Sequence, residues 1–306
     1  CSAYDGGGIW LSGNPTVDKC YIYQNSATNN GGNIYVYSGD PIFTNYSYFQ
    51  EGSAIYGGSV YCQNGSPTFD GCYIKYSSAS TRGGGLYASN ISGTFTNCMF
   101  ESNNAIGNGS QGGGVYMVFP YKNIPSTFTN CTFKWNNASN LGGGVVNQYG
   151  AISLFDTCSF ITNYATGANN GQGSGGGLFN DQTNPEIIDC IFDDNTAIAS
   201  GGGLYNWNAS PSVSSCYFSQ NAAASGGGIR NLSGSNPTVG TSSFCENTGS
   251  DIDGSYNDEG TNCFADSCTD SDDDGTLDDC DGFLHVYDGD FIQDVIDIAV
   301  DGDTIL

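Results

Sequence analysis

The clearest chemistry in the sequence belongs to an acidic stretch near its C-terminus. Oxygen-bearing residues occupy positions 1, 3, 5, 7, 9 and 12 of a loop: Asp270, Asp272, Asp274, Thr276, Asp278 and Asp281. Gly275 stands at position 6, where a calcium loop turns sharply. Ca²⁺ takes roughly six to eight hard oxygen ligands, and this loop offers five carboxylates and one main-chain carbonyl. The spacing predicts a calcium site, with a solvated acidic linker as the alternative.

Residues suited to catalysis are sparse elsewhere. Lys and Arg together number 6, and the single histidine is His285. A polysaccharide lyase needs a basic residue beside bound calcium, and a glycoside hydrolase needs two carboxylates at a fixed separation. Asp193 and Asp194 are the adjacent acidic pair within the repeats. No Ser-His-Asp arrangement is available there, so we expect a protein that is not an enzyme, with this pair as the weak catalytic candidates.

Composition narrows the range of partners. The net charge is −25, which disfavours nucleic acid and anionic membrane surfaces as partners. No run of about 18 apolar residues occurs, so no membrane span is expected. Tyr 20 and Phe 17 supply ample packing material, and the rest of the surface is rich in Asn, Ser, Thr and Gly. This composition is typical of extracellular β-rich proteins, and we expect a secreted or cell-surface location.

The elements that must position these residues form a repeat. Glycine runs recur every 25 to 33 residues. They begin at Gly6, Gly31, Gly57, Gly83, Gly112, Gly142, Gly175, Gly201 and Gly226. An aliphatic residue follows each run, and in most units an aromatic residue follows next. These aromatic residues are Trp10, Tyr35, Tyr61, Tyr87, Tyr116, Phe179 and Tyr205.

A second motif, Cys-x-(Phe/Ile)-x-x-Asn-x-Ala, lies between the glycine runs. Examples begin at Cys98, Cys131 and Cys158. Both motifs alternate with the period of two that is typical of β-strands, and turn residues separate them. Each unit therefore matches one coil of a solenoid whose strands stack in parallel on the next coil. The sequence predicts an all-β parallel β-helix of about nine coils over residues 1–250.

The paired motifs resemble the GGA(I/L/V) and FxxN repeats of polymorphic outer-membrane proteins, as in Gly112-Gly113-Gly114-Val115 and Phe100-x-x-Asn103. The resemblance covers residues 1–247. It implies a right-handed β-helix on a cell surface, with a role in adhesion or assembly. Residues 251–282 form a separate acidic connector, and its loop resembles a thrombospondin type 3 repeat, which implies bound calcium.

Stacked coils place equivalent residues in ladders. Cys20, Cys72, Cys98, Cys131, Cys158, Cys190 and Cys216 should line up inside, and we expect core packing there rather than disulfides or metal binding. The motif asparagines should stack at a turn, where side-chain amides bond along the rod and Asn tolerates a left-handed backbone. Cys245, Cys263, Cys268 and Cys280 fall outside the ladder and could form two disulfides by any of three pairings.

Alternation sends the aromatic residues from Trp10 to Tyr205 to the outside of the coils. We expect an exposed aromatic face, which could stack on sugar rings or on a neighbouring rod. Simple stabilisation of the sheet by cross-strand pairs is the alternative.

The last segment, 283–306, has apolar residues at helical spacing followed by a strand. Phe291, Ile292, Val295, Ile296 and Ile305 are its apolar positions. This order resembles the N-terminal cap of pectin-lyase-like β-helices. It could precede a second β-helix in a longer precursor, or it could cap the next subunit head to tail. We therefore expect a non-enzymatic surface filament or sheath subunit assembled from copies of itself, with a glycan-binding or host-binding adhesin as the alternative.

Overall fold

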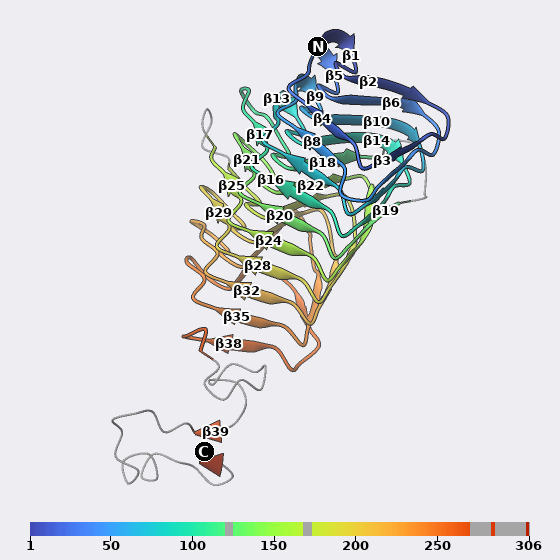
Figure 1. The fold of residues 1–306 in the computed structure, drawn as a ribbon. Coiled ribbons are helices and arrows are strands. Elements are labelled where there is room, and N and C mark those ends of the chain that lie inside the picture. The colour runs from blue at the N-terminus through green and yellow to red at the C-terminus, as the bar shows by residue number, and fades with distance from the viewer. Residues whose placement is uncertain (120–124, 168–172, 270–282, 285–303, 306) are drawn as a thin grey trace.

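The computed structural model describes residues 1–119, 125–167, 173–269, 283–284 and 304–305. Within them the chain winds into a parallel β-solenoid whose strands stack like rungs along the rod axis (Figure 1). This confirms the predicted all-β solenoid and its approximate number of coils. The strand pairings between described coils are all parallel, and most stay in register throughout, as in Tyr87 with Tyr116 and Phe100 with Phe133.

Each coil contributes to four sheets, here called A, B, C and D in chain order. Sheet A contains β1 (Ser2–Asp5), β5 (Ser26–Asn30), β9 (Ser53–Tyr56), β13 (Ser78–Arg82), β17 (Asn104–Ala105), β21 (Asn137–Ala138), β25 (Tyr164–Ala165) and β29 (Thr196–Ala197). Sheet B contains β2 (Ile9–Ser12), β6 (Ile34–Ser38), β10 (Val60–Gly65), β14 (Leu86–Ile91), β18 (Val115–Val118), β22 (Val145–Gln148), β26 (Leu178–Asp181), β30 (Leu204–Trp207), β33 (Ile229–Leu232) and β36 (Ile252–Asp253).

Sheet C contains β3 (Thr16–Asp18), β7 (Ile42–Thr44), β11 (Thr68–Asp70), β15 (Thr94–Thr96), β19 (Ser126–Thr129), β23 (Ile152–Asp156), β27 (Glu186–Ile188), β31 (Ser212–Ser214), β34 (Thr238–Gly240) and β37 (Asn257–Asp258). Sheet D contains β4 (Tyr21–Tyr23), β8 (Tyr48–Gln50), β12 (Tyr73–Lys75), β16 (Met99–Glu101), β20 (Thr132–Lys134), β24 (Ser159–Ile161), β28 (Ile191–Asp193), β32 (Tyr217–Ser219), β35 (Ser243–Cys245) and β38 (Cys263–Ala265).

The glycine runs form the turn between sheets A and B, where neighbouring coils approach closely. A Cβ atom at Gly143 would lie 2.5 Å from the carbonyl oxygens of both Gly176 and Tyr164. No side chain fits there, and Gly142 before it has a left-handed φ of 61°. The recurring glycines are therefore a packing requirement of the stacked coils.

The core lies inside the solenoid and is built from columns of identical side chains. Phe160, Phe192 and Phe218 of sheet D are fully buried and stack at centroid distances of 4.5 and 4.6 Å. Phe95 and Phe128 of sheet C form a second such column, 4.4 Å apart. Stacked aromatic rings bury large apolar areas, so these columns supply much of the hydrophobic stabilisation of the rod.

Sheet C was not anticipated from the sequence. Its strands are two to five residues long, and half of them carry a Thr, Ser or Asp on either side of one inward Phe or Val. Alternation over so few residues is weak evidence for a strand. A proline precedes many of these strands, as Pro41 and Pro67 do, and it could have marked where they begin.

The predicted boundary at residue 250 is wrong. The sheets continue through β36, β37 and β38, so a further coil runs on to Ala265. Its acidic composition obscured a regular backbone in which Phe264 still stacks on Phe244 at 5.0 Å. Beyond it, β39 (Phe283–Leu284) pairs in parallel with β40 (Thr304–Ile305), which confirms a strand at the end of the sequence. The predicted helix, with Phe291, Ile292, Val295 and Ile296, lies outside the described residues.

Candidate ligand-binding groove

The outward aromatic residues of sheet B do form a column. Trp10, Tyr35, Tyr61, Tyr87 and Tyr116 occupy the same register on successive strands. The rings of Tyr61 and Tyr87 stack 4.9 Å apart. After Val146 the column resumes with Phe179 and Tyr205, whose ring centroids are 5.2 Å apart.

The expectation that this whole column is exposed is wrong. Trp10 is 54% exposed, but Tyr116 and Phe179 are only 1% and 4% exposed, and Tyr35 and Tyr205 are also buried. Tyr61 and Tyr87 are half-buried. The reason is that residues on both flanks of the sheet rise beside the rings, and those packed against the central part of the column include Val118, Leu141 and Leu232. An outward direction on a strand therefore did not mean contact with solvent.

One of these flanking residues, Leu141, also lines a groove. A cavity of about 420 Å³ opens over β26 and β30, with Phe179 and Tyr205 as its floor. Leu141, Ser174 and Ala199 line one side, just before the glycine runs, and Asp181 and Trp207 line the other side. Three successive coils thus contribute to one aromatic groove with a single carboxylate.

Asp181 is held in place by amide donors. Gln148 Nε2 donates to Asp181 Oδ2 at 2.7 Å, and Gln182 Nε2 donates to Oδ1 at 3.3 Å. Gln148 is itself fixed by the Tyr116 hydroxyl, which donates to its Oε1. Trp207 is 41% exposed, and its ring centroid lies 6.4 Å from that of Tyr205. Burial raises the pKa of Tyr205, so its ring stays neutral at ordinary pH.

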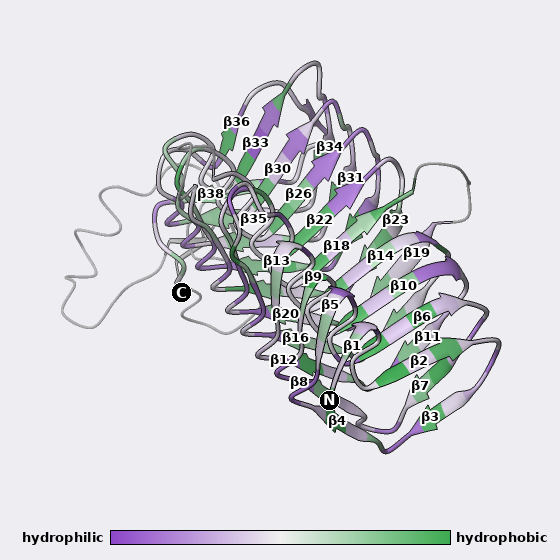
Figure 2. Ribbon diagram, turned by 90° about the horizontal axis from the view of Figure 1, so that it is seen from above, coloured by the Kyte–Doolittle hydropathy of each residue, from purple (hydrophilic) through white to green (hydrophobic). Residues whose placement is uncertain are grey.

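A ladder of buried asparagines beneath the groove orients its strands. In the first coils the second inward position of sheet B is apolar, as at Val36 and Met117. From β22 onward this position is occupied by asparagines, which we call the strand ladder: Asn147, Asn180, Asn206 and Asn231. Their amides bond in sequence at 3.2, 3.0 and 2.9 Å. β26, β30 and β33 accordingly carry hydrophilic segments (Figure 2).

The strand ladder escaped sequence reasoning, although its signal is visible. An asparagine stands two residues after the aliphatic position in each of the four later repeats. Asn180 lies between Phe179 and Asp181, and Asn206 lies between Tyr205 and Trp207. Because their amides are bonded inside the rod, these strands present their outward side chains to the groove in a fixed register.

The groove belongs to a recognised architecture. The family model described as right handed beta helix region matches residues 58–248. The chain belongs to this family. No curated protein sequence matches it. The match confirms the right-handed repeat predicted from the paired motifs, and it covers all the residues that line the groove.

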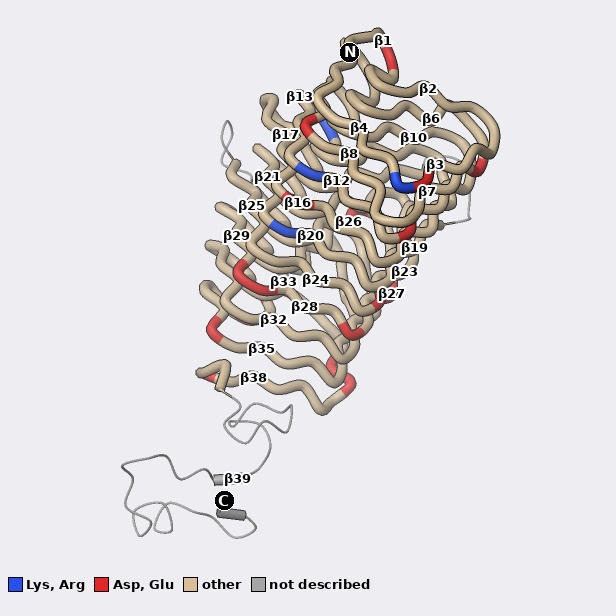
Figure 3. Tube along the Cα trace, viewed as in Figure 1, with Lys and Arg blue, Asp and Glu red and all other residues tan. Residues whose placement is uncertain are grey.

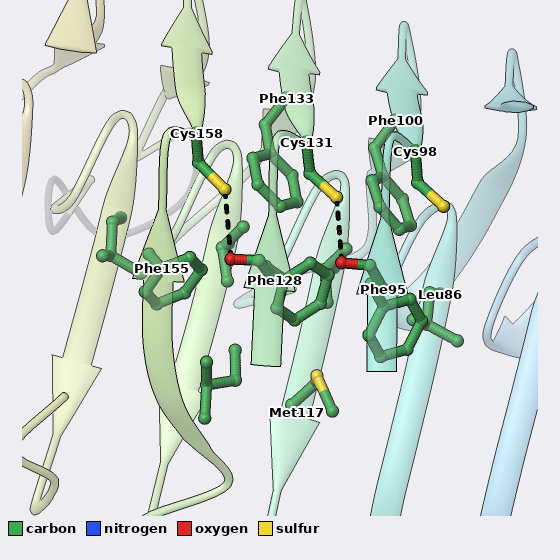
Figure 4. Close-up of a cluster of buried hydrophobic side chains, with 14 of the residues drawn as sticks. Leu86, Phe95, Cys98, Phe100, Met117, Phe128, Cys131, Phe133, Phe155 and Cys158 are labelled. Atoms are coloured by element: carbon green, nitrogen blue, oxygen red, sulfur yellow. Dashed lines mark hydrogen bonds between the residues drawn. The ribbon is translucent and has the colours of Figure 1, made fainter. Parts of the chain in front are cut away.

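The thiol ladder of the β-helix is buried from Cys72 to Cys216, as predicted for core packing, whereas Cys20 in the first coil is only partly buried. Cys72, Cys131, Cys158 and Cys190 are free and fully buried. The Cys158 thiol donates to the carbonyl of Phe128 at 3.5 Å, and the Cys131 thiol donates to that of Phe95 at 3.5 Å (Figure 4). Burial raises the pKa of the Cys131 thiol, which keeps it protonated and unreactive.

The motif asparagines also stack as predicted, and we call them the corner ladder: Asn103, Asn136, Asn163, Asn195, Asn221 and Asn247. Asn163 Nδ2 donates to Asn195 Oδ1 at 2.9 Å and to the Phe133 carbonyl at 2.8 Å. The expected left-handed backbone is not theirs, however. It falls on the preceding residue, as at Trp135 with a φ of 55°, because that residue makes the turn between sheets D and A.

The catalytic candidates of the β-helix bond to different coils. Asp193, at the end of β28, accepts a hydrogen bond from Ser219 Oγ at 2.6 Å in the next coil. Asp194 follows at a left-handed turn and accepts one from Thr162 Oγ1 at 3.2 Å in the preceding coil.

Acidic residues recur along the rod while basic ones are scattered (Figure 3). In the described residues, the ion pairs are Lys75–Glu101 and Arg230–Asp253, away from this pair.

The predicted calcium ligands from Asp270 to Asp281 lie outside the described residues. In the part of the chain that is described, no group of three His, Cys, Asp or Glu side chains is placed to hold a metal ion. That part also contains no helix of the length and apolarity that a membrane span requires.

Of the cysteines beyond the ladder, Cys245 and Cys268 form a disulfide. It ties the start of the acidic connector to the last coils.

Proposed function

We propose that this β-helix is a non-enzymatic extracellular protein that binds glycans in the groove over β26 and β30. The observation that carries the proposal is the combination of an aromatic floor, an exposed indole at Trp207 and an oriented carboxylate at Asp181. Aromatic faces stack on the apolar faces of sugar rings, and a carboxylate accepts hydrogen bonds from sugar hydroxyls. Concave sites of this volume with a few fixed polar groups are typical of ligand binding.

Two further features support a surface role. The Cys245–Cys268 disulfide favours an oxidising compartment outside the cytosol. The repeats resemble those of polymorphic outer-membrane proteins, which favours display on a cell surface. A thrombospondin-like calcium connector at 270–281 would stiffen the link between the rod and whatever follows it.

The groove is tested by removing its indole. Trp207→Ala should weaken binding to an oligosaccharide or insoluble polysaccharide about tenfold or more, because stacked aromatic pairs contribute roughly 1 kcal/mol and the buried area contributes more. Trp135→Ala is the matched control, since Trp135 is similarly exposed at 47% but follows sheet D rather than the groove. The measurement is a pull-down on cellulose, chitin, xylan and mannan, followed by calorimetry. Equal losses in both variants, or none, would contradict the proposal.

Head-to-tail assembly through residues 283–306 is a second proposal about the same protein. Its assembly residues fall outside the described part of the chain or, at Ile305, on a strand whose side chains are not described.

A further inference from the structure

The floor of the groove runs along the rod. Its floor consists of Phe179 and Tyr205 on adjacent coils, with ring planes inclined by only 21°. The next side chain in the same register is Arg230. Successive binding positions are thus separated by one coil, along the axis. A groove with this shape suits an extended chain of sugar units that lies parallel to the rod.

The charges around the groove are one-sided. Asp181 is the acidic side chain among its lining residues, and no Lys or Arg lines it in the described part of the chain. Arg230, which follows Tyr205 in the same register beyond the groove, is engaged by Asp253 in an ion pair. The whole chain carries a net charge of −25, so its field repels anions at low salt.

Asp181 is also unable to move away. Both of its carboxylate oxygens receive amide donors, from Gln148 and Gln182, and its strand is fixed from below by Asn180. A carboxylate on a ligand would therefore meet a fixed like charge beside a partly desolvated aromatic floor, where charge repulsion is stronger than in water. Sugar hydroxyls, by contrast, can donate to the remaining lone pairs of Asp181.

From these observations we infer that the groove selects neutral glycan chains and that Asp181 is the specificity-determining residue that rejects uronic acids. The inference rests on the proposed function, since it names the class of glycan that the same groove binds. Rejection by an opposing fixed charge is a common source of specificity.

The experiment compares neutral and acidic hexasaccharides of equal length on the full chain. Cellohexaose, xylohexaose and mannohexaose represent neutral chains, and hexagalacturonate represents acidic ones, each measured by calorimetry at low and high salt. The wild-type protein should bind one of the neutral chains at least tenfold more tightly than hexagalacturonate. Asp181→Asn, which keeps an acceptor for Gln148, should reduce that preference to about threefold or less.

Asp156→Asn is the control, because it removes one negative charge from an outward position of sheet C and should leave the preference unchanged. Circular dichroism confirms that each variant is folded. The inference is overturned if the wild-type protein binds hexagalacturonate as tightly as the neutral chains, or if Asp181→Asn leaves the preference intact. If none of the hexasaccharides binds, or if Trp207→Ala binds them as the wild type does, the proposed function fails and the inference fails with it.

Discussion

Single side chains in this protein act across coils. Asn163 donates from one amide nitrogen to both neighbouring coils, and its Oδ1 accepts from the main-chain nitrogen and the Nδ2 of Asn136. One residue type at one position therefore satisfies buried polar groups that would otherwise be left without partners. The motif predicted this ladder because a fixed spacing in a solenoid implies stacking. The inward position of Asn206 was not predicted, because a polar residue in a strand ordinarily faces solvent.

Asn163→Ala should lower the free energy of unfolding by about 3 kcal/mol, because several buried donors and acceptors lose their partner. Chemical denaturation followed by circular dichroism measures the change. Asn236→Ala is the matched control, since the Asn236 side chain makes one exposed hydrogen bond to the next coil, to Asn257 Oδ1, and should cost well under 1 kcal/mol. Similar losses in both variants would show that the corner ladder contributes little.

At the level of elements, the sequence predicted the strands that carry strong markers. Glycine runs located sheet B and the Cys-x-Phe motif located sheet D, but the short strands of sheet C have neither. The groove itself could not be predicted. Its walls depend on Leu141, Ser174 and Ala199 from three different coils, and the loop lengths between repeats give no measure of how far such residues rise over the sheet.

The last coil should respond to pH through Asp251. Burial raises the pKa of this carboxyl, and the hydrogen bond from Asn247 only partly offsets that effect. The folded state thus favours the protonated form, so the protein loses stability as pH rises from the unfolded pKa of about 4 through the higher pKa of the folded state. Asp251→Asn should therefore raise the melting temperature at pH 7, and the difference should vanish below about pH 4.

Thermal unfolding of both proteins between about pH 4 and pH 7 measures this difference in melting temperature. Asp40→Asn controls for the simple removal of a negative charge from an acidic protein, because Asp40 is an exposed carboxylate that accepts one hydrogen bond from the Ser66 amide. A lower melting temperature for Asp251→Asn at pH 7 would mean that the bond from Asn247 outweighs the cost of burial.

The whole molecule behaves as a one-dimensional stack, because each coil pairs only with the coils beside it. Assembly and stiffness of the rod would therefore be controlled at its ends and at the acidic connector. Composition predicted a calcium loop in the connector, and helical spacing predicted a cap-like segment at 283–306. Both stay predictions, because the calcium loop and the helix of the cap-like segment lie outside the described part of the chain.

Calcium should bind the connector of the full chain. Asp272→Asn combined with Asp274→Asn should reduce the affinity at least tenfold, because two of the five carboxylates lose their charge. Calorimetry on chelator-treated protein measures it. Asp193→Asn combined with Asp194→Asn removes the same charge from the rod and should leave calcium affinity unchanged. Equal binding by both double variants would contradict a site at 270–281.

Head-to-tail filaments should form from the full chain and should be absent after deletion of residues 283–306. Electron microscopy of the purified protein shows either outcome directly. Trp207→Ala should still assemble, because the groove lies on the side of the rod. Filaments that persist after the deletion would rule out a cap donated by this segment.

The direction of the hydrogen bonds in the two asparagine ladders has an electrical consequence. Every hydrogen bond between members of the two ladders runs from the amide nitrogen of one asparagine to Oδ1 of its neighbour toward the C-terminus, from Asn103 to Asn247 and from Asn147 to Asn231. Aligned amides polarise one another, so their moments add along the axis instead of cancelling. The corner ladder ends on the carboxylate of Asp251, a negative charge at the positive end of the array. The rod therefore carries a net dipole along its axis, which distinguishes its two ends even though its coils look alike.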